Sequence, residues 1–100
     1  MKLSEIESWV FENKVGNTQW GEACDPNLDI DRPWNATHAY PTHVTFIKDD
    51  WFPTQAGAIF CSKAHPELAP KGALLIITPN PKLQFVKFVT EFFPPPPNGS

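Results

Sequence analysis

The sequence predicts a small α/β domain whose sheet is mostly parallel and is flanked by helices. Two short apolar runs, residues 56–61 and 73–77, carry this prediction. Neither alternates apolar with polar residues, so both are expected to be buried on two faces, like strands of a parallel sheet. The segment between them, residues 62–72, contains two prolines and ends at Gly72. Its length of about eleven residues is near the minimum for a crossover between parallel strands.

A helix is expected after the second run, over residues 81–93. Asn80 is a favourable N-cap, and Pro81 fits the first helical position, where its missing N–H costs nothing. Pro94 ends the helix. Apolar residues recur at helical spacing and predict a core-facing stripe: Leu83, Phe85, Val86, Phe88, Val89, Phe92 and Phe93. Because the stripe is rich in phenylalanine, a lipid-binding or partner-binding helix is the alternative.

A shorter amphipathic helix is expected over residues 3–12. Ser4 and Glu7 have the spacing of a capping box, in which each side chain accepts a hydrogen bond from the other's free backbone N–H. One face of this helix is apolar and is expected to join the core: Leu3, Ile6, Trp9 and Val10.

The residues between the two helices supply the rest of the sheet. Residues 43–47 are rich in β-branched side chains and predict a strand. Residues 28–31 are a candidate for a short edge strand, whereas residues 18–27 have no clear pattern. Gly16 is expected to adopt the left-handed conformation in the turn after the first helix.

Composition limits the classes of function. A chain of 100 residues with 41% hydrophobic and 13% aromatic residues is one globular domain. Its net charge of −3, without a basic cluster, argues against nucleic-acid binding. No apolar run approaches the ~20 residues of a membrane helix, and residues 1–5 lack the apolar core of a signal peptide. A cytoplasmic location is expected, with Cys24 and Cys61 as free thiols.

The sequence contains no catalytic signature, and no cofactor or metal is expected. The spacing of its three histidines and two cysteines matches no zinc pattern. Cys61 ends an apolar run, so it is expected to pack in the core rather than act as a nucleophile. A glycine-rich phosphate loop is also missing.

Two aromatic residues, Trp51 and Phe52, follow the predicted strand at residues 43–47. Ligands of open parallel sheets bind outside the carboxyl ends of the strands. The two rings are therefore candidates for a platform on which a flat ligand ring stacks. The alternative is that both side chains fold back as a lid on the core.

Five stretches follow one another in a recognisable order and spacing: Ile-Asp-Arg-Pro at 30–33, Thr-His-Val-Thr-Phe-Ile at 42–47, Gln-Ala-Gly-Ala-Ile-Phe at 55–60, Leu-Ala-Pro-Lys-Gly-Ala-Leu-Leu at 68–75 and Asn-Pro-Lys-Leu-Gln-Phe-Val-Lys-Phe at 80–88. Together they resemble the N-terminal, non-repeat domain of bacterial UDP-3-O-acylglucosamine N-acyltransferases, enzymes of lipid A synthesis. The likeness covers about residues 28–97. A more distant likeness is to the N-terminal uridine-nucleotide domain of the Mur ligases, which build the peptidoglycan stem peptide.

The resemblance implies a UDP-sugar recognition domain over residues 1–93, followed by a proline-rich linker over residues 94–100. In that family a β-helix of hexapeptide repeats comes next. It supplies the catalytic histidine, receives the acyl carrier protein and forms a homotrimer. No such repeats are present in this sequence. The chain alone is therefore expected to bind a UDP-sugar weakly, without catalysis and without membrane contact.

The resemblance also implies a uridine site. Phe46 matches the family's uracil-stacking phenylalanine, Asp49 stands where the family has asparagine, and Phe52, with Trp51 beside it, stands where the family has tyrosine. Phe46 is expected to face Trp51 or Phe52 across a gap. Asp49 lacks the N–H donors of an amide, and the following loop is shorter than in the family. These departures favour a rival function, a non-catalytic structural or protein-interaction module that kept the fold and lost nucleotide binding.

Overall fold

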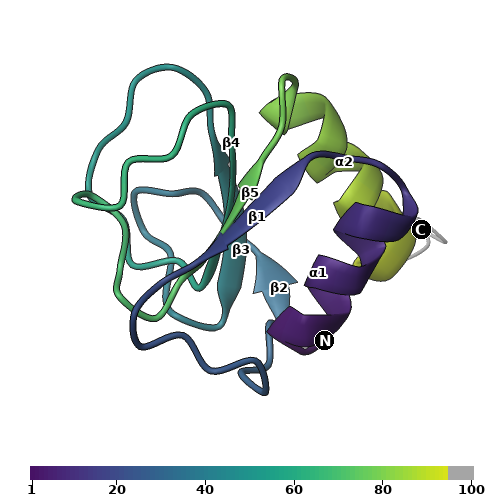
Figure 1. Cartoon of the computed structure of the whole chain (residues 1–100), viewed down its shortest axis with the longest axis horizontal. Helices are drawn as coiled ribbons and strands as arrows, with labels where there is room; N and C mark the ends of the chain where they lie inside the picture. Colours follow the sequence, from purple (N-terminus) through teal and green to yellow (C-terminus); the bar gives the residue numbers. More distant parts are fainter. Residues whose placement is uncertain (95–100) are drawn as a thin grey trace, which may run out of the picture.

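The computed structural model describes residues 1–94 and contains a sheet and two helices (Figure 1). The predicted linker at 94–100 lies, apart from Pro94, outside the described residues. The elements are α1 (Leu3–Glu12), β1 (Asn17–Trp20), β2 (Arg32–Pro33), β3 (His43–Ile47), β4 (Ala58–Cys61), β5 (Leu74–Ile77) and α2 (Pro81–Phe92). Within this part of the chain, neither helix is long and apolar enough to cross a membrane.

The sheet is five-stranded and mixed, with the strand order β1-β5-β4-β3-β2. Strands β2, β3, β4 and β5 run parallel to one another, and β1 pairs antiparallel with β5 at the edge of the sheet. The predicted strands at 43–47, 56–61 and 73–77 correspond to β3, β4 and β5. The edge-strand prediction at 28–31 is wrong by a few residues, because the strand pairs with β3 at Arg32–Pro33, and Asp29 instead forms an isolated bridge with Lys2.

The two faces of the sheet are covered differently (Figure 1). Both helices pack on one face, where α1 and α2 join side chains from alternate strand positions in what we call the helix-side cluster, centred on Phe60 and Phe88. The other face is covered by the loops that connect the parallel strands, and its buried residues, including Ile59 and Leu75, form the loop-side cluster. The α/β class is confirmed, but the connections between parallel strands contain no helix, because they are short and proline-containing.

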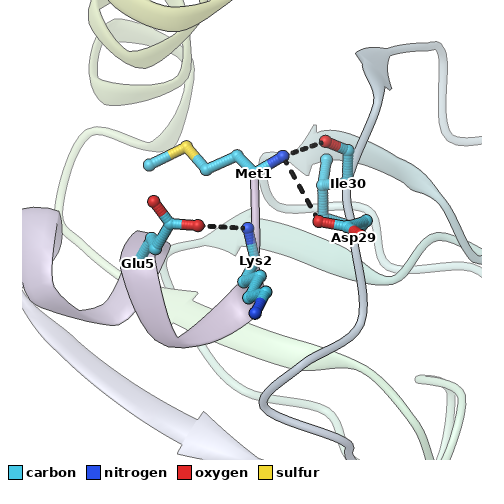
Figure 2. Close-up of polar contacts among 5 residues, drawn as sticks. All are labelled: Met1, Lys2, Glu5, Asp29 and Ile30. Atoms are coloured by element: carbon cyan, nitrogen blue, oxygen red, sulfur yellow. Dashed lines mark hydrogen bonds and ion pairs between the residues drawn. The ribbon is translucent and has the colours of Figure 1, made fainter.

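The N-cap of helix α1 lies two residues before the predicted cap, Ser4. Lys2 is its N-cap residue, and the Lys2 backbone N–H donates to Glu5 Oε1 at 3.0 Å, so the predicted Ser4–Glu7 capping box is wrong (Figure 2). The helix start is fixed by the neighbouring chain, because the Met1 ammonium donates to Ile30 O at 2.9 Å and Leu3 N–H donates to Leu28 O. Glu7 instead accepts hydrogen bonds from Thr18 and Trp20 of β1. The predicted apolar face of α1 is buried as expected.

The turn after α1 needs a glycine for a different reason than predicted. Lys14, with φ of 53°, adopts the left-handed conformation, and Gly16 does not. A Cβ atom on Gly16 would lie 1.9 Å from Ile77 O. Gly16 therefore allows the backbone to approach β5 closely at the start of β1.

Helix α2 turns a narrower face to the sheet than the predicted stripe. Phe88 is fully buried, and Phe85 and Val89 pack against the helix-side cluster while keeping part of their surface exposed. Leu83 and Val86 are 50% and 49% exposed, so their assignment to a core stripe is wrong. The large ring of Phe88 lies in this interface, 5.2 Å from Trp9 and 5.6 Å from Phe60, and Leu83 and Val86 lie on the other side of the helix.

Candidate functional site

A pocket of about 540 Å³ opens where the parallel strands end. The last residues of β3, β4 and β5 are Ile47, Cys61 and Ile77, and the strand register places these three side by side. The segments that leave the strands therefore start from one edge of the sheet. In open parallel sheets this carboxyl edge is the usual place for a ligand. The volume lies within the range of small-molecule sites.

The pocket is lined by the loop after β3, the loop after β4 and the start of α2. Lys48 and Asp49 follow β3, and Ser62 follows β4. The segment from β5 to α2 and the first turns of α2 complete the wall with Pro79, Asn80, Pro81, Lys82, Leu83 and Val86. Residues more than thirty positions apart in the sequence thus line one site, with polar side chains from the strand edge and both polar and apolar side chains from the segment that enters α2.

The charges around this pocket suit a weakly anionic ligand. Two lysines, Lys48 and Lys82, and one aspartate, Asp49, line it, although the whole chain carries a net charge of −3. All three side chains are exposed, so their interactions with a ligand are screened by water and salt. Asn80 stands at the N-cap position of α2 without a side-chain capping hydrogen bond, which leaves its amide available to a ligand.

Asp49 is the predicted site residue that lines this pocket. Phe46 precedes the last residue of β3, near the carboxyl edge as expected. Its ring lies on the helix side of the sheet, with its centroid 5.0 Å from that of Phe85. The ring of Phe46 is therefore packed between the sheet and α2.

Trp51 lies on the opposite face of the sheet from Phe46. Its ring packs against the loop-side cluster, 5.5 Å from the ring of His65, and its Nε1–H donates to Lys63 O at 2.8 Å. The expected arrangement in which Phe46 faces Trp51 across a gap is thus not present, because the sheet separates the two rings. Trp51 instead joins the loops after β3 and β4, as the lid alternative predicts. Phe52, beside it, is 38% exposed.

The thiols and histidines offer no nucleophile or metal site in the described residues. Cys24 and Cys61 are free, and they lie in the helix-side and loop-side clusters respectively. Burial raises the pKa of Cys61 to about 11, and burial also raises the pKa of Cys24, so both thiols are protonated at neutral pH. His65 shares a 2.9 Å contact with Glu67, whose pKa is lowered mainly by this hydrogen bond. Residues 1–94 contain no group of three or more potential metal ligands.

An aromatic cluster that the sequence did not predict lies where β3 begins, at the other end of this strand from the pocket. His43 begins β3, and its ring stacks on Trp34 at 5.4 Å and lies 5.5 Å from the ring of Tyr40. The Tyr40 backbone N–H donates to His43 Nδ1 at 3.0 Å, which fixes the orientation of the imidazole. Residues 34–41 have no helix or strand period that could have revealed this packing.

The pocket residues contributed by α2 were also missed. Leu83 and Val86 were assigned to the buried stripe because they are apolar and helically spaced. A signal was present in the sequence: residues 81, 85, 88 and 92 form a stripe on their own, and positions 83 and 86 lie on the other side of an ideal helix. The sequence therefore showed that Leu83 and Val86 are not needed to form the buried face of α2.

Fold and site together define a class, a small α/β domain with a mixed five-stranded sheet and a pocket at the carboxyl edge of its parallel strands. No protein-family model matches the chain, and no curated protein matches it either. The resemblance to the lipid A acyltransferases and to the Mur ligases therefore stays a prediction.

Proposed function

We propose that this chain is the UDP-sugar recognition domain of a sugar N-acyltransferase similar to those of lipid A synthesis. The uridine end of the ligand binds at the carboxyl edge of the parallel strands. The observation that carries the proposal is the pocket at this edge, because it contains Asp49, a residue assigned to the uridine site on sequence grounds alone. The pocket is large enough for a nucleotide.

The pocket chemistry supports a uracil nucleotide. Uracil presents an N3–H donor between two carbonyl oxygens, and the Asp49 carboxylate is an acceptor for that N–H. Lys48 and Lys82, which line the same pocket, supply positive charge for the phosphates. Phe46 and Phe52 do not line this pocket and stay predicted contacts only, whereas Trp51 lies on the other face of the sheet from Phe46.

The binding is expected to be weak. The described residues that line the pocket include no aromatic side chain to contribute the roughly 1–3 kcal/mol of base stacking, and the charged groups of the pocket are all solvent-exposed. After the entropic cost of association, such contacts correspond to a dissociation constant in roughly the millimolar range. A further domain of the acyltransferase would supply the remaining contacts and the catalytic histidine.

Titration of the ¹⁵N-labelled chain with UMP tests this function. The proposal predicts fast-exchange shifts that saturate at millimolar UMP and centre on residues 46–52 and on the start of α2. Inorganic phosphate at the same concentration is the control, because it reports binding by the lysines alone. Resonances that stay unmoved at ~10 mM UMP would contradict the proposal, since that concentration is well above the expected dissociation constant.

The second candidate function is a structural or protein-interaction module that kept the fold without the ligand. The position of Trp51 favours it, because this ring is held on the loop side by Lys63 and is separated from Phe46 by the sheet. A domain that binds uracil between two aromatic rings would need both on one side. The same titration separates the two functions, since this module predicts no UMP-dependent shifts.

A further inference from the structure

Helix α2 exposes two aliphatic side chains on the side that does not face the core. Leu83 and Val86 are 50% and 49% exposed, whereas Phe88 on the other side is fully buried. Their three-residue spacing places them next to each other on the helix surface. Single exposed apolar residues are common on protein surfaces. These two are adjacent, and they line the same pocket as Asp49.

The pocket therefore combines an apolar wall from α2 with polar groups that can form hydrogen bonds. Leu83 and Val86 make up much of the wall on α2, and the prolines on either side of Asn80 extend it. Lys48 and Asp49 stand at the strand edge. A ligand that fills this pocket needs a flat apolar face and a polar rim. A pyrimidine has this shape, because its ring faces are apolar and its edge carries the hydrogen-bonding groups.

We infer that Leu83 and Val86 form the surface on which one face of the uracil ring rests, while the ring edge points to Asp49. This inference rests on the proposed function and adds a specificity-determining wall that is aliphatic and belongs to α2. Contact with the ring removes apolar surface of both side chains from water, which favours binding in proportion to the area covered. It also explains why these two positions are apolar although the core does not use them.

The position of the predicted aromatic residues strengthens the argument. The ring of Phe46 lies against Phe85 on the helix side, and that of Trp51 lies on the loop side. A ring bound in the pocket beside Asp49 thus has the α2 wall as the apolar surface provided by the pocket itself. The wall also lies next to Lys82, so a nucleotide resting on it keeps its phosphate near a positive charge.

The test is the UMP affinity of variants of the full chain, measured by NMR titration. Leu83→Ala combined with Val86→Ala is expected to raise the dissociation constant at least about five-fold, because the apolar area in contact with the ring is lost. Leu83→Met keeps an apolar wall and is expected to bind within about two-fold of the parent chain. Phe11→Ala is the matched control: Phe11 is 54% exposed on α1, which contributes no residue to this pocket.

Each result bears on the inference. A five-fold loss in the double variant, with parent-like affinity in Leu83→Met and Phe11→Ala, supports it. Unchanged affinity in a double variant that keeps the parent's dispersed amide spectrum overturns the inference and leaves the proposed function intact, because UMP still binds. If the parent chain shows no UMP-dependent shifts, the proposed function fails and the inference fails with it. Should the double variant unfold, Leu83→Asn alone serves instead, with the same expected loss.

Discussion

Asp49 is the residue at which the sequence departs most clearly from the family it resembles. A carboxylate accepts the N3–H of uracil, but its second oxygen then faces a carbonyl oxygen of the base, and two acceptors repel each other. An amide at this position would supply an acceptor for N3–H and a donor for the neighbouring carbonyl. The aspartate thus weakens a contact that the pocket geometry otherwise favours.

Asp49→Asn is therefore expected to strengthen UMP binding about three- to ten-fold, since one hydrogen bond gained typically contributes about 0.5–1.5 kcal/mol. Asp50→Asn is the matched control, because it removes the same charge from an exposed neighbour that does not line the pocket. The two dissociation constants are measured by the same titration. Equal gains in both variants would mean that charge alone, and not the hydrogen bond, limits the affinity.

Cys61 gives a second prediction at this scale, on the pH dependence of stability. Burial raises its pKa from 9.0 to about 11, so the unfolded chain loses the thiol proton at lower pH than the folded chain. The contribution of the protonated Cys61 thiol to the free energy of unfolding is complete below pH 9 and is lost as pH rises through 11. At pH 10 the loss amounts to roughly 1–2 kcal/mol.

Urea unfolding of the parent chain and of Cys61→Ala at pH 7 and pH 10 measures this loss. The parent's free energy of unfolding is expected to fall by roughly 1–2 kcal/mol more than that of the variant between the two pH values. All ionisable groups other than Cys61 are common to both proteins. An equal fall in both would show that Cys61 ionises as readily in the folded chain as in the unfolded one.

At the scale of single elements, the two sides of the twelve-residue helix α2 have different roles: one packs in the core and the other lines the pocket. Its buried side is centred on Phe88, whose ring lies between those of Trp9, Phe60 and Phe92. Its other side contributes Leu83 and Val86 to the pocket. Substitutions on the two sides should therefore affect different properties of the protein.

Phe88→Ala is expected to cost ~3–5 kcal/mol of unfolding free energy, because it leaves a cavity in the helix-side cluster. Phe85→Ala should cost less, though more than ~1 kcal/mol, because part of this ring is already exposed. Leu83→Ala should stay within about 0.5–1 kcal/mol of the parent chain, since half of its side chain is in water. Urea unfolding curves of the three variants give this order. A larger cost for Leu83→Ala than for Phe88→Ala would reverse the assignment of the two helix sides.

For the whole molecule, the sequence was sufficient to predict a helix or strand wherever its residue pattern was local and unbroken. Strand β3 has the predicted bounds, β4 and β5 differ from theirs by one or two residues, and α1 has the predicted bounds and buried face. Strand β1 was missed because its four residues are mostly polar and none is fully buried, and because its partner β5 lies more than fifty residues away in the sequence. Such long-range pairing leaves little local signal.

The site was predicted only at its strand edge. Asp49, which the family resemblance assigns to the uridine site, lies in the pocket because it comes two residues after the end of β3, at the carboxyl edge where ligands of parallel sheets bind. The place of Trp51 depends on a hydrogen bond to Lys63 across two loops, which no sequence period encodes. The contribution of α2 depends on how far the helix is rotated about its axis, and the packing of Phe88 determines that rotation.

The central claim is that a uridine nucleotide binds in the pocket between the strand ends and α2. The most direct measurement is the detection of intermolecular nuclear Overhauser effects between the H5 and H6 protons of UMP and the methyl groups of the protein. The account predicts cross-peaks to Leu83 and Val86, which line the pocket and are half exposed. Cross-peaks confined to methyl groups elsewhere, or none at saturating UMP, would contradict it.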